Sequence, residues 1–138
     1  MTTGGRTVLV VEDNDKNMKL LRDVLHATGY QTLEATTGRQ ALELAVQHGP
    51  DLVLMDVRLP DMNGVEALRQ VRTDPRIASI CVLAITAQAM QGDRERLVGA
   101  GFDGYLPKPV DIDELLMAVG QHCGRAHIAA GSGADTRI

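Results

Sequence analysis

The sequence predicts an α/β fold, a doubly wound parallel sheet of five strands with helices on both faces. Short apolar runs such as "VLVV" and "LVLM" alternate with amphipathic segments, which is the pattern of a parallel sheet buried by crossover helices. The 138 residues, 44% hydrophobic and 23% charged, match one globular domain. We expect that domain to cover residues 7–122.

The predicted strands are short and mostly aliphatic. They cover residues 7–11 (TVLVV), 31–35 (QTLEA), 51–55 (DLVLM), 80–85 (ICVLAI) and 104–106 (GYL). In a sheet with the flavodoxin-like strand order 2-1-3-4-5, the functional crevice lies beyond the carboxyl ends of the strands, where the strand order reverses. The residues that follow each strand are therefore the first candidates for a site.

The first two helices have clear start and stop signals. The helix predicted over 15–28 ends before Gly29, and its apolar residues recur at helical spacing: Met18, Leu21, Val24 and Leu25. The second follows Thr37, whose T-x-x-Q arrangement with Gln40 is typical of a capping box, and it stops at Gly49-Pro50. Its predicted apolar face is Ala41, Leu42 and Ala45.

Three further helices complete the pattern. The third, over 64–72, faces the core through Val65, Leu68 and Val71. The fourth, over 92–100, is short and polar apart from Leu97 and Val98, so we expect it to be the most loosely held. The fifth opens with the D-x-x-E pair of Asp111 and Glu114 and runs to about residue 122 through Ile112, Leu115, Leu116 and Val119.

The two ends of the chain have no such pattern, and we predict flexible segments over 1–6 and 123–138. No apolar run approaches the roughly 20 residues that cross a bilayer, and "MTTGGR" lacks a signal-peptide core. Cys81 and Cys123 have no metal-binding spacing, which favours free thiols. These features predict a cytoplasmic protein.

Charge and aromatic content exclude several classes of partner. The formal net charge is −4 and no basic stripe is present, which argues against nucleic acid and anionic membranes. One Phe and two Tyr leave few rings for stacking on a flavin or a base. An FMN site is also disfavoured because acidic "EDND" stands where a phosphate-binding loop would lie, and GxxxxGK[ST] is absent.

Polar or charged residues follow four of the five predicted strands: Glu12-Asp13 after the first, Asp56 after the third, Thr86 after the fourth and Lys108-Pro109 after the fifth. Because the first and third strands are neighbours in the predicted order, the three carboxylates should converge. Like charges repel unless a cation neutralises them, and all-oxygen ligands that leave room for water suit Mg²⁺. The sequence therefore predicts a magnesium site.

A carboxylate beside Mg²⁺ and a lysine is suited to forming an aspartyl phosphate. Asp56 is the expected nucleophile because it follows the central strand, with Lys108 and the Thr86 hydroxyl contacting phosphoryl oxygens. Taken singly, each residue has a structural explanation: helix-dipole complementarity for Glu12-Asp13, a turn before Pro60 for Asp56, and an ordinary cap or solvated side chain for the others. Their joint arrangement favours the site.

Four motifs, in this order, resemble the receiver domains of bacterial two-component response regulators: "VLVVEDN", "DLVLMDVRLPDMNG", "LAITA" and "YLPKPV". The resemblance spans residues 7 to about 122, and in detail the sequence looks like the single-domain, DivK-like subgroup and also like receiver modules of hybrid histidine kinases. It implies that Asp56 accepts a phosphoryl group from a histidine of a kinase or phosphotransfer protein.

The resemblance also implies roles for neighbouring residues. Asp13, Asp56 and the Arg58 backbone carbonyl would ligate Mg²⁺, and Glu12 would act mainly through water. Thr86 and Tyr105 match the family's switch pair, and Ala87 matches the small residue that leaves access to the phosphate. The Lys108-Pro109 bond matches one that is usually cis. Arg58 and Gln88 stand at positions that tune aspartyl-phosphate lifetime.

The expected function is a stand-alone phosphorylatable switch, read by a downstream protein at the surface of the fourth helix, fifth strand and fifth helix. We expect no turnover chemistry beyond self-phosphorylation from small donors and slow self-dephosphorylation. Arg94, Glu95 and Arg96 are candidates for that partner face or for a solvated helix surface. The alternatives are a hybrid-kinase receiver module, a phosphorylation-independent binding module and an aspartyl phosphohydrolase, which would want an acid where Arg58 stands.

Overall fold

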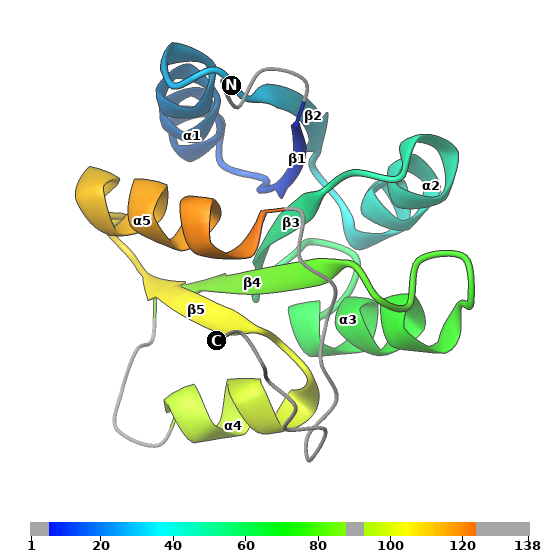
Figure 1. Cartoon of the computed structure of the whole chain (residues 1–138). Helices are drawn as coiled ribbons and strands as arrows, with labels where there is room; N and C mark the ends of the chain where they lie inside the picture. The colour runs from blue at the N-terminus through cyan, green and yellow to red at the C-terminus, as the bar shows by residue number, and fades with distance from the viewer. Residues whose placement is uncertain (1–5, 88–92, 124–138) are drawn as a thin grey trace, which may run out of the picture.

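The strands form one parallel sheet in the order β2-β1-β3-β4-β5, so the predicted fold class and topology are confirmed (Figure 1). The computed structural model describes residues 6–87 and 93–123. The strands are β1 Thr7–Val11, β2 Gln31–Ala35, β3 Leu52–Asp56, β4 Cys81–Thr86 and β5 Gly104–Pro107. The helices are α1 Asp15–Ala27, α2 Gly38–His48, α3 Gly64–Thr73, α4 Asp93–Ala100 and α5 Ile112–His122.

The sheet separates two apolar layers, because successive strand side chains point to opposite faces. On one face α1 and α5 pack through Leu21, Leu25, Leu115 and other buried residues. On the other face lie α2, α3 and α4, with Ala41, Leu68, Leu97 and the single Phe of the chain, Phe102. Figure 1 shows this division of the helices between the two faces.

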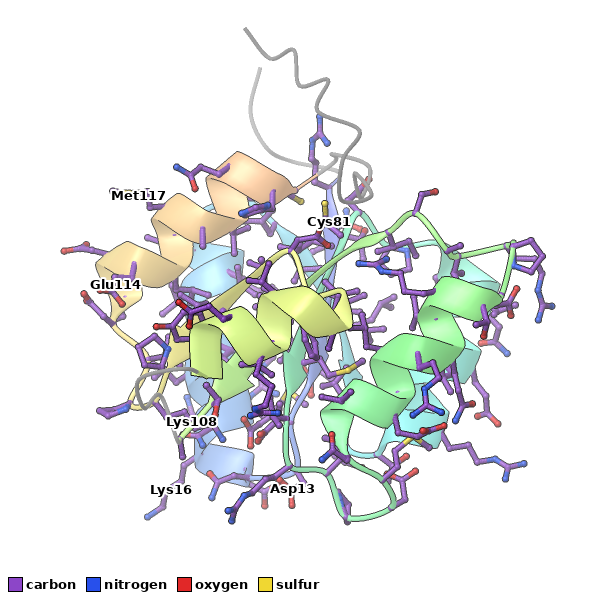
Figure 2. All side chains as sticks on the ribbon, turned by 90° about the horizontal axis from the view of Figure 1, so that it is seen from below. Asp13, Lys16, Cys81, Lys108, Glu114 and Met117 are labelled. Atoms are coloured by element: carbon purple, nitrogen blue, oxygen red, sulfur yellow. The ribbon has the colours of Figure 1, made fainter. Side chains whose placement is uncertain are left out.

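The strand register fixes which residues meet at the carboxyl edge. Val11 is paired with Met55, so Glu12 and Asp56 come next on adjacent strands. Asp56 is paired with Ile85, and Thr86 with Pro107, which precedes Lys108. The backbone continues this pattern, since Lys108 N donates to Thr86 O at 2.8 Å. Figure 2 places Asp13 and Lys108 at one end of the sheet and Cys81 at the other.

Some predicted helix details are wrong. Ile112 was expected among the core-facing residues of the fifth helix, but it is 44% exposed. Leu42 and Val65 do pack against the core as predicted, although each is only partly buried. Thr37 does accept from Gln40 N, as predicted, but the Gln40 side chain accepts from Thr36 N rather than from Thr37 N.

A largely buried arginine, Arg72, joins three segments away from the carboxyl edge. Arg72, near the end of α3, donates through Nη1 to Ala78 O at 2.9 Å and Ile80 O at 2.6 Å, ahead of β4. Its Nη2 donates to Gly101 O at 3.0 Å, just after α4, and to Asp103 Oδ2 at 2.9 Å. The same Asp103 oxygen accepts from Val82 N at 2.8 Å. This cluster holds the C-terminal end of α4 to the sheet.

Candidate functional site

Asp56 is a buried carboxylate with both oxygens held in place. It is the last residue of β3 and is 5% exposed. Its Oδ1 accepts from the backbone N–H of Arg58 at 2.9 Å, and its Oδ2 accepts from Lys108 Nζ at 2.7 Å. The carboxylate therefore has a fixed orientation at the edge of the sheet.

Two further acids converge on Asp56. Glu12, Asp13 and Asp56 each offer one oxygen, and these three atoms lie within 4.8 Å of one another. Glu12 is 1% exposed, whereas Asp13 is exposed to solvent. Burial raises the pKa of Glu12, and the nearby Asp56 charge raises it further, although hydrogen bonding from Asn14 N and the charge of Lys108 act in the opposite direction. The negative charges of these carboxylates are therefore only partly neutralised by their surroundings.

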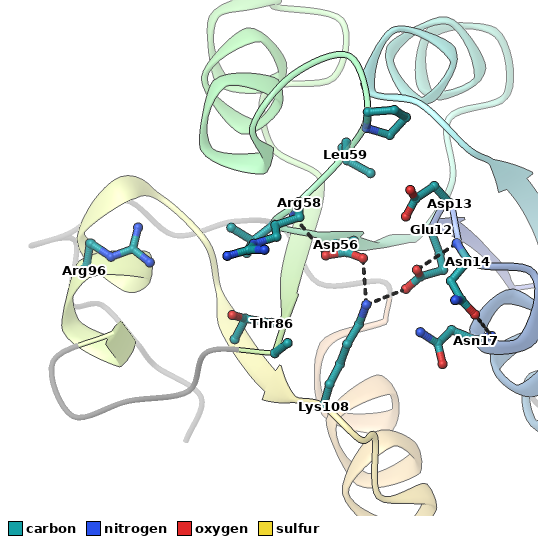
Figure 3. Close-up of a pocket in the computed structure, with 13 residues that line it drawn as sticks. Glu12, Asp13, Asn14, Asn17, Asp56, Arg58, Leu59, Thr86, Arg96 and Lys108 are labelled. Carbon is teal, nitrogen blue, oxygen red and sulfur yellow. Dashed lines mark hydrogen bonds and ion pairs between the residues drawn. The ribbon is translucent and has the colours of Figure 1, made fainter.

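Lys108 supplies part of that charge. Its Nζ lies 2.7 Å from Asp56 Oδ2 and 3.2 Å from Glu12 Oε1 (Figure 3). Burial alone would lower the pKa of Lys108, but the contacts with Asp56 and Glu12 outweigh it and the pKa is raised. The ammonium is therefore charged at neutral pH. The Lys108-Pro109 peptide bond that leads into α5 is cis.

These residues line a cleft of about 380 Å³. It brings together seven of the residues selected from the sequence: Glu12, Asp13, Asp56, Arg58, Thr86, Ala87 and Lys108. The side chain of Thr86 is buried beside Asp56, while Ala87 is exposed. Gln88 lies outside the described residues. Arg96, which the sequence suggested for a partner face, lines this cleft from α4 (Figure 3).

Tyr105 does not line this cleft. It lies in β5 opposite Ala84, two residues before Thr86 on the neighbouring strand, and it is half-buried. Its neighbours at the surface include Val98 of α4 and Met117 of α5. Tyr105 therefore faces the groove between these helices.

The loop after Asp56 contains residues that the sequence reasoning missed. Gly64 N donates to Val57 O at 2.7 Å, and a Cβ on Gly64 would lie 2.8 Å from both Asp56 O and Val57 Cα. Asn63 accepts from Val65 N at 2.6 Å and so begins α3. The "PDMNG" turn residues were a signal for this tight connection, but they do not reveal how closely it approaches Asp56.

The donor set fits a hard divalent cation. Three carboxylate oxygens face one another, and the cleft is open enough for water ligands. Glu12 Oε1 is buried and accepts no hydrogen bond within the described part of the chain, since its contact with Lys108 is an ion pair. Oxygen ligands with room for water are the preference of Mg²⁺, and no sulfur or imidazole is in this group.

Residues 8–120 match the response regulator receiver domain family. The chain belongs to this family. It is 40% identical over 121 residues to the polar-differentiation response regulator DivK of Brucella ovis, which covers 88% of this chain and 98% of that protein. The resemblance inferred from the four motifs is therefore confirmed, and this receiver is a domain of two-component signalling.

Solved receiver structures have the same fold. The receiver domain of a sensor histidine kinase from Pseudomonas aeruginosa has a TM-score of 0.79 and 35% identity, covering 86% of this chain and 98% of that one; it holds a magnesium ion in its active site cleft. The chemotaxis response regulator CheY4 of Vibrio cholerae has a TM-score of 0.79 and 27% identity, covering 84% and 97%. None of the helices described in this receiver is long and apolar enough to span a membrane.

Proposed function

We propose that Asp56 accepts a phosphoryl group from a phosphohistidine, on a histidine kinase or a histidine phosphotransfer protein, in a Mg²⁺-dependent reaction. The observation that carries the proposal is the position of Asp56, a buried carboxylate between two other acids and Lys108 in an open cleft. A carboxylate oxygen attacks phosphorus, the phosphorus–nitrogen bond breaks, and its electron pair leaves with the imidazole nitrogen.

The surrounding residues divide into cation ligands and phosphoryl ligands. Glu12, Asp13, Asp56 and the Arg58 backbone carbonyl would hold Mg²⁺, which when bound would neutralise charge on the phosphoryl oxygens. Lys108 is already charged and in contact with Asp56, so it can contact an added phosphoryl oxygen. Thr86 donates its hydroxyl to another oxygen, and Ala87 leaves the entrance open.

Phosphorylation then acts on a two-state surface. In the proposal Thr86 moves toward the phosphoryl group and Tyr105 turns inward, changing the face made by α4, β5 and α5. That face has exposed apolar side chains, Val98 and Met117, available for a protein partner. Arg58 and Gln88 set the lifetime of the aspartyl phosphate by controlling access of water.

We place this activity in a signalling protein rather than a turnover enzyme. Its own chemistry would be limited to self-phosphorylation from small phosphodonors and slow self-dephosphorylation. The similarity to DivK over 98% of that protein supports a single-domain response regulator. A cytoplasmic location is part of the same proposal, and the two free cysteines, Cys81 and Cys123, support it.

The test uses acetyl phosphate with Mg²⁺ and intact-mass measurement. The wild-type protein should gain one phosphoryl group that is stable to acid and labile to base. Asp56→Asn should gain none, whereas Asp23→Asn, a matched change at an exposed position of α1, should behave like the wild type. An equal mass gain in Asp56→Asn would refute the assignment. Removing Mg²⁺ with EDTA should abolish the gain in the wild-type protein and in Asp23→Asn.

A further inference from the structure

The loop that follows the phosphoacceptor is attached to a helix far away in the sequence. We define the β3–α3 loop as residues 58–63. Within it, Asp61 Oδ1 accepts from Gly38 N at 2.8 Å and Oδ2 accepts from Arg39 N at 3.0 Å. Gly38 and Arg39 begin α2, where backbone N–H groups have no partner inside the helix. Asp61 therefore caps α2 from outside.

This capping is additional to the local one. The Thr37 side chain already accepts from Gln40 N, so the local N-cap leaves the two preceding amides to Asp61. A carboxylate at a helix N-terminus is also favoured by the helix dipole. The two hydrogen bonds from α2 lower the pKa of Asp61, so the carboxylate is charged at neutral pH.

An apolar contact strengthens the same connection. Gly38 is buried under Met62, and a Cβ on Gly38 would lie 2.7 Å from Met62 Cγ and 2.8 Å from its Sδ. Adjacent residues of the β3–α3 loop thus hold α2 through one polar and one apolar contact. A displacement of the loop cannot occur without disturbing the first turn of α2.

The other side of the loop touches the site. Arg58 N donates to Asp56 Oδ1, and a bridge between Arg58 and Asn63 closes the loop on itself. Gly64 N donates to Val57 O, directly after the phosphoacceptor. The loop is therefore a short, closed connection with Asp56 at one end and α2 at the other.

We propose that Asp61 is a positioning residue that holds the β3–α3 loop on α2, keeps the Arg58 backbone oriented toward the cleft, and couples cation binding to the order of the first turn of α2. This inference rests on the proposed function, because it assigns the Arg58 carbonyl to the Mg²⁺ site. Coupling between two sites is reciprocal. Asp61 should strengthen Mg²⁺ binding by the same factor by which Mg²⁺ strengthens the contact with α2.

The experiment compares Asp61→Asn with Asp74→Asn. Asp74 is a suitable control because it also accepts a backbone N–H in a loop, from Arg76 at 2.9 Å, but it follows α3 and does not line the cleft. Mg²⁺ affinity is measured by calorimetry. Removing a residue that orients a metal ligand weakens metal affinity by about 10- to 100-fold. Asp61 acts indirectly, through the loop, so we expect Asp61→Asn to weaken Mg²⁺ affinity by about 3- to 10-fold. Asp74→Asn should leave Mg²⁺ affinity unchanged.

A second readout follows the helix directly. Hydrogen exchange at the Gly38 and Arg39 amides should slow when Mg²⁺ is added to the wild-type protein and should not respond in Asp61→Asn. The wild-type measurement stands even where the variant folds poorly. Asp61→Glu, which keeps the carboxylate on a longer side chain, should recover part of the affinity.

The outcomes separate the two proposals. If the wild-type protein binds no Mg²⁺, or if Asp56→Asn accepts phosphoryl, the proposed function fails. If the wild type binds Mg²⁺ but Asp61→Asn binds it equally well, or exchange at Gly38 and Arg39 ignores Mg²⁺, the role of Asp61 is overturned. An equal loss of affinity in Asp74→Asn would also overturn it, since the effect would then reflect general destabilisation.

Discussion

Arg72→Met should destabilise the protein severely although the residue is remote from the cleft. The guanidinium makes four hydrogen bonds, to three backbone carbonyls and to Asp103. The side chains of Arg72 and Asp103 are 15% and 11% exposed, so water replaces these contacts poorly. Methionine keeps the apolar stem of Arg72 but removes the positive charge beside the Asp103 carboxylate, which still accepts from Val82 N.

The expected size of the effect follows from this burial. Removing one partner of a buried ion pair costs about 3–5 kcal/mol, and the residual exposure places Arg72→Met near the lower end, about 3 kcal/mol. That is a large part of the roughly 5–15 kcal/mol that stabilises an ordinary domain. Arg72→Lys should recover little, because one ammonium cannot replace the guanidinium fork that reaches both Ala78 and Ile80, which follow α3, and Gly101, which follows α4.

The assay is urea denaturation followed by far-UV circular dichroism, since the chain has no Trp for fluorescence. The control is Lys19→Met, which removes an exposed ion pair with Asp23 at 2.6 Å and should cost less than about 1 kcal/mol. A loss below about 1 kcal/mol for Arg72→Met would refute the reasoning, because Arg72 would then behave as a surface residue.

Three further predictions concern the site. Gly64→Ala should lose about 1–3 kcal/mol of stability, because its Cβ would meet the backbone of Asp56 and Val57. The same variant should be phosphorylated more slowly by acetyl phosphate. An unchanged phosphorylation rate would contradict the close approach of Gly64 to Asp56. Glu12→Gln should be more stable than the wild type near neutral pH in EDTA while binding Mg²⁺ more weakly. The raised pKa of Glu12 means that the folded state binds more protons than the unfolded state between the ordinary and the raised value, so stability falls as pH rises through that window; the amide removes this loss. Asp61→Asn should lower the free energy of unfolding at pH values above the ordinary Asp pKa. The difference from the wild type should disappear as pH falls through the lowered pKa of Asp61. Urea titrations at several pH values measure this difference.

The sequence predicted which residues meet at the carboxyl edge, because the strand register carries strand-end residues to one place. β1, β3 and β4 are apolar runs with distinct ends. Asp56 and Thr86 could therefore be assigned to the carboxyl edge, although β3 and β4 each end one residue later than expected. Adjacency of β1 and β3 then brought Glu12 next to Asp56. These inferences need only the period of the strands and the strand order.

Contacts made by long side chains between distant elements could not be predicted this way. No sequence pattern singles out Arg72, at the end of the predicted third helix, or Asp61, in the turn before Asn63. Their partners, Gly101 and Gly38, are 29 and 23 residues away and are reached only after the helices pack. The prediction for Ile112 was wrong for a related reason: helical spacing does not reveal which apolar residues of α5 reach the sheet, and only Leu115 and Val119 are fully buried there.

The two outer strands have a consequence for self-association. β5 is only four residues long and ends at Pro107, which has no N–H to offer a further strand. At the opposite margin β2 presents Glu34, which forms an ion pair with Arg22 at 3.1 Å. Neither margin is a good template for intermolecular backbone pairing. When copies of this molecule meet at high concentration, the sheets should remain separate and contacts should form between helices.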